Sequence, residues 1–212
     1  AEPHNPSQAP EPYYSMFPPE SLPPCRGGED ALADKGYRWQ WLRDAWDTAI
    51  HGYAGQLDRT RANYHGMLRL IDDQVKRFVS FLDEKGLRED TIIVFVSDHG
   101  DFVGEYGLIR KGPDLPECLT RIPLFFTGPG IVAGETAHQA HVSICDIMPT
   151  LCDALDVPLP DGVQGRSLWP LLTGQEFPPD EFSSIYAEHG YGGLSYTAED
   201  DLDPVEEGAL NP

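Results

Sequence analysis

The chain has 212 residues, and its 15 Lys+Arg against 35 Asp+Glu give a formal net charge of −20 at pH 7. This acidic balance excludes a nucleic-acid-binding protein, which needs a basic footprint, and no apolar run is long enough to span a membrane. Hydrophobic residues make up 40% of the chain, enough to build one sizeable domain or part of a larger one. A small anionic substrate stays compatible with the charge if a metal or a local cation faces it.

Residues 1–28 are rich in proline and contain Gly27-Gly28. Dense proline prevents regular helix and central strand, so we expect an extended segment laid over a domain surface. His4, between Pro3 and Asn5-Pro6, then sits in a stiff backbone. Taken alone, it is better read as a solvent-facing histidine in a coil.

Two helices are predicted next. Within residues 30–62, apolar side chains recur at spacings of three, four and four and mark one helical face: Trp39, Leu42, Trp46 and Ile50. We expect these indoles to pack in a core rather than to form a ligand cage. Within residues 64–85 a clearer apolar stripe appears at Leu68, Ile71, Val75, Phe78 and Leu82, and Gly86 is typical of a helix C-cap.

The uncharged run 91–96, TIIVFV, favours a strand buried on both faces, and a helix followed by such a strand is typical of a parallel α/β sheet. It breaks into Ser97-Asp98-His99-Gly100-Asp101. Open α/β sheets bind ligands beyond the carboxyl ends of their strands, so a metal or an anion is expected here, with Gly100 allowing close backbone approach. The alternative is a solvated turn after a core strand.

The remaining chain contains a second short strand at 122–127, closed by Gly128-Pro129-Gly130. Asp146 is predicted to cap a helix with Pro149 in its first turn. A short apolar helical turn is expected at 167–172, and 175–212 reads as a loop-rich acidic tail.

The four cysteines, Cys25, Cys118, Cys145 and Cys152, form no CxxC pair and lack zinc-ligand spacing. Buried free thiols are therefore expected. They favour a reducing compartment such as a bacterial cytoplasm, although a fragment would hide any signal peptide and a periplasmic location then stays open.

Several short motifs occur in one order over roughly residues 3–172. They are Pro3-His4-Asn5-Pro6, Tyr64-His65-Gly66-Met67, Ser97-Asp98-His99-Gly100-Asp101, Gly104-Glu105-Tyr106-Gly107-Leu108, Lys111-Gly112, Arg121-Ile122-Pro123-Leu124, Asp146-Ile147-Met148-Pro149-Thr150-Leu151 and Gly165-Arg166-Ser167-Leu168. This order resembles a type I sulfatase of the alkaline phosphatase superfamily. The resemblance implies an α/β fold: part of a three-layer α/β/α sandwich with a mostly parallel central sheet. Residues 1–212 would form a partial catalytic domain with its core at 64–172.

By position, the resemblance implies that Asp98 and His99 bind a divalent cation, usually calcium in sulfatases. Imidazole suits Mn or Zn better, so the metal stays open. Lys111 matches a lysine that contacts the sulfate oxygens, and His4 matches a histidine near the ester oxygen. Arg110, beside Lys111, is a further cation of interest. The substrate implied is a small anionic sulfate ester.

The formylglycine nucleophile of sulfatases arises from a Cys/Ser-x-Pro-x-Arg motif, and Cys25-Arg26-Gly27-Gly28-Glu29 does not match it. We therefore expect a fragment whose nucleophile and remaining metal ligands lie upstream. Asp-His in place of Asp-Asn leaves a phosphodiesterase or phosphonate monoester hydrolase as the alternative. A third hypothesis is that the chain alone is a non-catalytic truncated domain.

Overall fold

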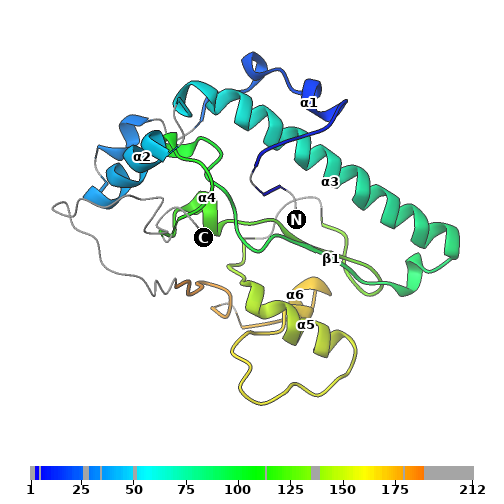
Figure 1. Ribbon diagram of the computed structural model, residues 1–212. Coiled ribbons are helices and arrows are strands. Elements are labelled where there is room, and N and C mark those ends of the chain that lie inside the picture. Colours follow the sequence, from blue (N-terminus) through cyan, green and yellow to red (C-terminus); the bar gives the residue numbers. More distant parts are fainter. Residues whose placement is uncertain are drawn as a thin grey trace. The chain divides into compact units, whose positions relative to one another are not determined.

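The computed structural model describes residues 3–4, 6–25, 29–33, 35–49, 52–112, 114–134, 139–178 and 180–188. These residues divide into two compact units (Figure 1). The first unit comprises the described residues up to Phe81 together with His99–Arg121, and the second comprises Leu82–Asp98 and Ile122–Glu188. Most of the predicted acidic tail, 189–212, lies outside the described residues.

The first unit is mainly helical. Its α-helices are α1 (Tyr13–Met16), α2 (Tyr37–Ala49), α3 (Leu57–Lys85, here up to Phe81) and α4 (Glu117–Thr120). Short 3-10 turns occur at Pro19–Ser21, Glu29–Leu32, Ala54–Gln56 and Glu105–Gly107. The predicted helices are confirmed, although α3 starts seven residues earlier than the apolar pattern indicated and α2 ends at Ala49.

The core of the first unit joins α2 to the loop that follows His99. Leu42 and Trp46 of α2 are buried against Phe102 and Leu108 of that loop. Trp39 adds an edge-on contact to the Phe102 ring, with centroids 6.0 Å apart. The predicted packing role of the indoles is therefore confirmed for Trp39 and Trp46. Ile50, the fourth residue of the predicted face, lies outside the described residues.

The proline-rich segment lies along α3 (Figure 1, blue beside cyan). Asn63 donates a hydrogen bond to the Ser7 carbonyl at 2.9 Å, and the Tyr13 hydroxyl donates to Asp73 at 2.8 Å. The Phe17 and His65 rings contact each other at a tilt of 38°, with centroids 5.6 Å apart. For the residues of this segment that the structure describes, the predicted extended segment on a domain surface is confirmed, with α1 and one 3-10 turn as interruptions.

The fully buried residues of α3 lie outside the predicted apolar stripe. They are Ala62, Gly66 and Met67, where the N-terminal segment crosses. Within the stripe, Leu68 and Phe78 are 42% and 72% exposed, and the other three residues are half-buried. Small residues, rather than the leucines and phenylalanines, meet the backbone of the crossing segment.

In the second unit, α3 ends at Lys85 in a Schellman arrangement. The Leu87 N–H donates to the Leu82 carbonyl at 2.9 Å, and the Gly86 N–H donates to the Asp83 carbonyl at 3.1 Å. Gly86 has a φ of 65°, which glycine tolerates without the steric penalty of a Cβ. The predicted C-cap is confirmed.

Two strands follow, β1 (Ile93–Val96) and β2 (Leu124–Thr127), close to their predicted ranges. They pair antiparallel, with Phe95 opposite Phe125 and the two rings stacked at 4.8 Å. Because this pairing is antiparallel, β2 is not the parallel neighbour expected for β1. Phe125 and Val96 are 51% and 39% exposed, so burial of β1 on both faces is wrong for the described residues.

Helices α5 (Ile147–Ala154) and α6 (Trp169–Leu172) complete the second unit. Asp146 is buried but does not cap α5 as predicted. Its carboxylate instead accepts the Ser143 N–H and the Arg166 N–H, each at 2.8 Å, within a capping box that opens at Ser143. Thr150 donates to the Asp146 carbonyl and accepts the Leu168 N–H at 2.8 Å. These bonds join the 146–151 and 165–168 motifs.

All four cysteines are free thiols, as predicted, but none is buried and Cys145 is exposed. No helix among the described residues is both long and apolar enough to cross a membrane.

Candidate active site

The candidate site is built on the segment that follows β1. Asp98 is exposed and is the last residue of the 82–98 segment of the second unit, whereas His99 is part-buried and begins the 99–121 segment of the first. The two predicted metal ligands are thus consecutive in the chain where it passes from one unit to the other.

The His99 ring is held by its own loop. Its Nδ1 lies 2.7 Å from the Gly100 carbonyl oxygen, which can only accept a hydrogen bond. Nδ1 therefore carries the proton in the neutral ring, and Nε2 presents its lone pair away from this contact. Metal-binding histidines commonly donate one ring N–H to a carbonyl in this manner.

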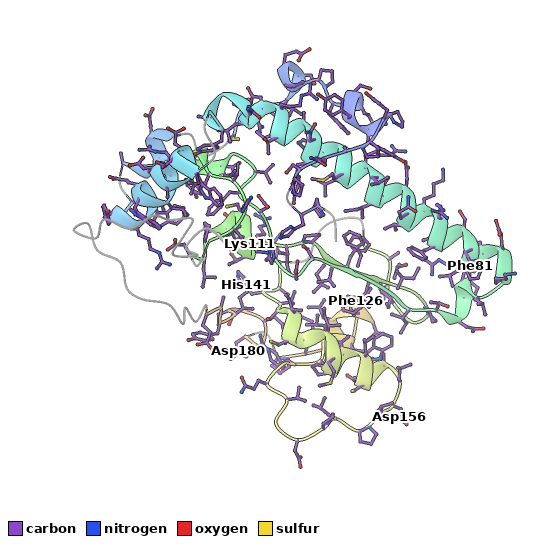
Figure 2. All side chains as sticks on the ribbon, in the orientation of Figure 1. Phe81, Lys111, Phe126, His141, Asp156 and Asp180 are labelled. Carbon is purple, nitrogen blue, oxygen red and sulfur yellow. The ribbon has the colours of Figure 1, made fainter. Side chains whose placement is uncertain are left out.

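Lys111 meets this second nitrogen. Its Nζ lies 3.1 Å from the His99 Nε2, so the ammonium donates to the imidazole lone pair. Lys111 is labelled in Figure 2. Both side chains are part-buried. A pairing between two residues twelve positions apart brings together a predicted metal ligand and the predicted sulfate-binding cation.

Gly100 has a different role from the predicted one. A Cβ built on it would collide with the Cys118 carbonyl oxygen, and its N–H donates to the Leu119 carbonyl at 2.8 Å. The close approach that Gly100 allows in the structure is to the backbone of α4. This contact fixes the carbonyl that orients His99.

Asp101 is the site residue to which sequence reasoning assigned no role. Its carboxylate accepts the Val103 N–H at 3.1 Å and the Arg110 N–H. Burial raises the pKa of this carboxyl, while those two N–H groups and the nearby His99 and Lys111 oppose the rise. The spacing of Asp101 two residues after His99 was the available signal.

Arg110 and His4 are the other two residues of interest. The Arg110 guanidinium is centred 4.7 Å from the Trp46 ring centroid, so it packs on the core of the first unit. His4 is exposed in the segment that lies along α3. Of the predicted site residues, Lys111 and His99 are thus brought together.

The donor set at His99 suits a divalent cation only in part. The Nε2 lone pair of a carbonyl-anchored imidazole and the adjacent carboxylate of Asp98 are both metal-ligand groups. Among the residues that the structure describes, no group of three or more His, Cys, Asp or Glu side chains is placed to hold an ion. Further ligands would have to come from elsewhere.

Solved structures define the class of fold. The chain matches a phosphonate monoester hydrolase from Silicibacter pomeroyi with a TM-score of 0.71 and 29% identity, over 84% of this chain and 37% of that one. The fold is accordingly of the α/β alkaline-phosphatase-like class predicted from the motif order.

The sulfatase family model matches residues 1–157, and the chain therefore belongs to the sulfatase family. It is 34% identical over 197 residues to an arylsulfatase of Clostridium perfringens, covering 90% of this chain and 39% of that protein. It is also 32% identical over 208 residues to the multifunctional alkaline phosphatase superfamily protein PehA of Trinickia caryophylli, covering 92% and 40% respectively. The chain spans about two fifths of the length of these relatives.

Proposed function

We propose that the protein carrying this chain is a metal-dependent sulfuric ester hydrolase, and that this chain supplies part of its metal site and a sulfate-binding cation. The observation that supports this most directly is the Lys111–His99 pair, in which an ammonium lies 3.1 Å from an oriented imidazole nitrogen. Membership of the sulfatase family supports the same reaction class. The substrate would be a small anionic sulfate ester.

In this proposal Lys111 binds the sulfate oxygens. Negative charge on those oxygens must be held as the ester bond breaks, and a fixed ammonium does so without reorganising. Its part-buried position strengthens the attraction relative to a fully solvated lysine. The background charge of −20 makes such a local cation necessary.

Asp98 and His99 would hold the divalent cation. His99 would do so through Nε2, and the bound ion would then take the place of the Lys111 ammonium at that lone pair. Calcium, Mn and Zn are the candidates, with imidazole favouring the last two. The ion would supply Lewis-acid polarisation of a sulfate oxygen. His4 is proposed to stabilise or protonate the leaving alkoxide, for which imidazole suits neutral pH. A formylglycine nucleophile is proposed to come from outside this chain.

The test uses the intact protein that contains this chain, with an aryl sulfate as substrate. Removing one preorganised cationic contact should lower kcat/KM about 10²–10³-fold. We therefore expect the kcat/KM of Lys111→Ala to be lower than that of wild type by this factor. Lys76→Ala, on the exposed face of α3, is the matched control and should leave turnover unchanged. Undiminished kcat/KM in Lys111→Ala would contradict the assignment of Lys111.

The metal is tested separately by elemental analysis of the purified protein. We expect one divalent ion per chain in wild type and a clear loss in both Asp98→Ala and His99→Ala. Equal metal content in wild type and both variants would contradict the assignment of these two ligands.

A phosphonate monoester hydrolase is the second candidate. His99 in the second ligand position and the likeness to the Silicibacter pomeroyi enzyme favour it. Parallel assays with an aryl sulfate and an aryl phosphonate monoester separate the two functions. A kcat/KM at least tenfold higher for the phosphonate would overturn the sulfatase proposal.

The chain of 212 residues by itself is proposed to be non-catalytic. It offers Asp98 and His99 as the two ligands of the proposed site, and a partial ligand set holds metal weakly. Purified as such, it is expected to show no turnover and little bound metal. Measurable sulfatase turnover by this chain would contradict that expectation.

A further inference from the structure

Asp101 ties together the two ends of the loop that carries Lys111. Its carboxylate accepts the Val103 N–H at 3.1 Å on one side and the Arg110 N–H on the other. The Phe102 N–H in turn donates to the Arg110 carbonyl at 2.8 Å. Both backbone groups of Arg110, the residue directly before Lys111, are therefore held from the 101–102 side of the loop.

The Asp101 carboxylate is also linked to His99 and Lys111 by electrostatic attraction. It is part-buried. Two residues before Asp101 lies His99, whose Nε2 meets the Lys111 Nζ at 3.1 Å. These contacts connect the four residues in series. The His99 side chain contacts the Lys111 side chain, Lys111 follows Arg110 in the chain, and the Arg110 N–H donates to the Asp101 carboxylate.

We propose that Asp101 is a positioning residue for Lys111, holding the lysine backbone through the Arg110 N–H and its ammonium by charge, so that Nζ is directed to the anion site. This inference rests on the proposed function, since Lys111 must bind the substrate for its position to matter. Asp101 itself does not touch the substrate.

The chain offers a control for Asp101, namely a second aspartate whose carboxylate accepts two backbone N–H groups. Asp146, in the second unit, also accepts two backbone N–H groups, from Ser143 and Arg166, each at 2.8 Å. Asp146→Asn therefore removes the same chemistry at a place unconnected with Lys111 by any of the contacts described. A purely structural effect should appear equally in both variants.

The experiment is a double-mutant cycle in the intact protein, measuring kcat and KM with an aryl sulfate. Asp101→Asn, which keeps the side-chain shape, is expected to raise KM about tenfold while the fold is retained. Asp101→Asn combined with Lys111→Ala should have the kcat/KM of Lys111→Ala within about threefold, because residues acting through one another are not additive. Asp146→Asn should lower Tm and leave KM unchanged.

Two results would overturn the inference while leaving the proposed function intact. The first is that the Asp101→Asn protein has the wild-type KM, although Lys111→Ala has a lowered kcat/KM. The other is a double variant whose losses multiply, which means that Asp101 acts independently of Lys111. If Lys111→Ala keeps wild-type kcat/KM, the assignment of Lys111 in the proposed function fails first. Should Asp101→Asn not fold, Asp101→Glu replaces it in the same cycle.

Discussion

A Cβ at Gly66 would lie 2.6 Å from the carbonyl oxygen of Tyr13, closer than real Cβ contacts allow. Gly66 is thus the point at which α3 admits the backbone of the N-terminal segment. Gly66→Ala is expected to destabilise the protein by about 1–3 kcal/mol through overpacking, despite the higher helix propensity of alanine. Thermal unfolding measures the effect. Gly55→Ala is the control, since nothing lies within 4 Å of a Cβ there, and an equal Tm change in both variants would contradict the prediction.

His65 makes the docking of this segment dependent on pH. Burial, and secondly the charge of Arg61, lower the pKa of His65 below its ordinary value of 6.5. The folded state therefore binds fewer protons than the unfolded state, and stability is present above pH 6.5 and lost as the pH falls through the lowered pKa. Tm measured from pH 7.5 down to 5 should fall more steeply in wild type than in His65→Gln. Parallel curves would refute the role of His65.

Cys118 should react more slowly than the exposed Cys145. Burial first, then the charge of Glu105, raises its pKa to about 11. At pH 8 only about one thiol in a thousand is then ionised, and the thiolate is the reactive form. Alkylation followed by peptide mass analysis should label exposed Cys145 well before Cys118. Equal labelling rates in the native protein would contradict this prediction.

Thr150 should contribute strongly to the stability of the second unit, although its side chain is small. It is 1% exposed, and its hydroxyl accepts the Leu168 N–H while donating to the Asp146 carbonyl. Thr150→Val leaves a buried N–H without its partner, which costs about 1–3 kcal/mol. Denaturant unfolding measures the loss. Thr173→Val, at a less buried helix end, is the comparison, and an equal loss there would count against the argument.

Local pattern was enough to predict the helices and strands of this chain. The spacing of Leu42 and Trp46 predicted a helical face that is indeed buried, and the run 91–96 contains β1. Burial was harder to predict, because it depends on what lies opposite. Leu68 and Phe78 share a helical face, yet the segment that crosses α3 does so at Gly66, where a small residue admits a backbone.

The sequence predicted which residues belong to the candidate site, but it did not predict which of them are in contact. Motif order pointed to His99 and Lys111 separately, and only the folded loop brings them to 3.1 Å. Asp101 received no role, because its function depends on backbone N–H groups that sequence spacing does not reveal. Arg110 looked equivalent to Lys111 in sequence, but its guanidinium stacks on Trp46.

The loop that precedes Lys111 contains three residues other than glycine in the left-handed region: Val103, Tyr106 and Arg110, with φ of 45°, 59° and 63°. Such conformations are costly and persist only where surrounding contacts impose them. The entropy of arranging this loop is therefore lost during folding, before any anion arrives. If Lys111 binds the substrate as proposed, the anion meets a lysine whose backbone is already arranged, so its binding free energy is not diminished by ordering this loop.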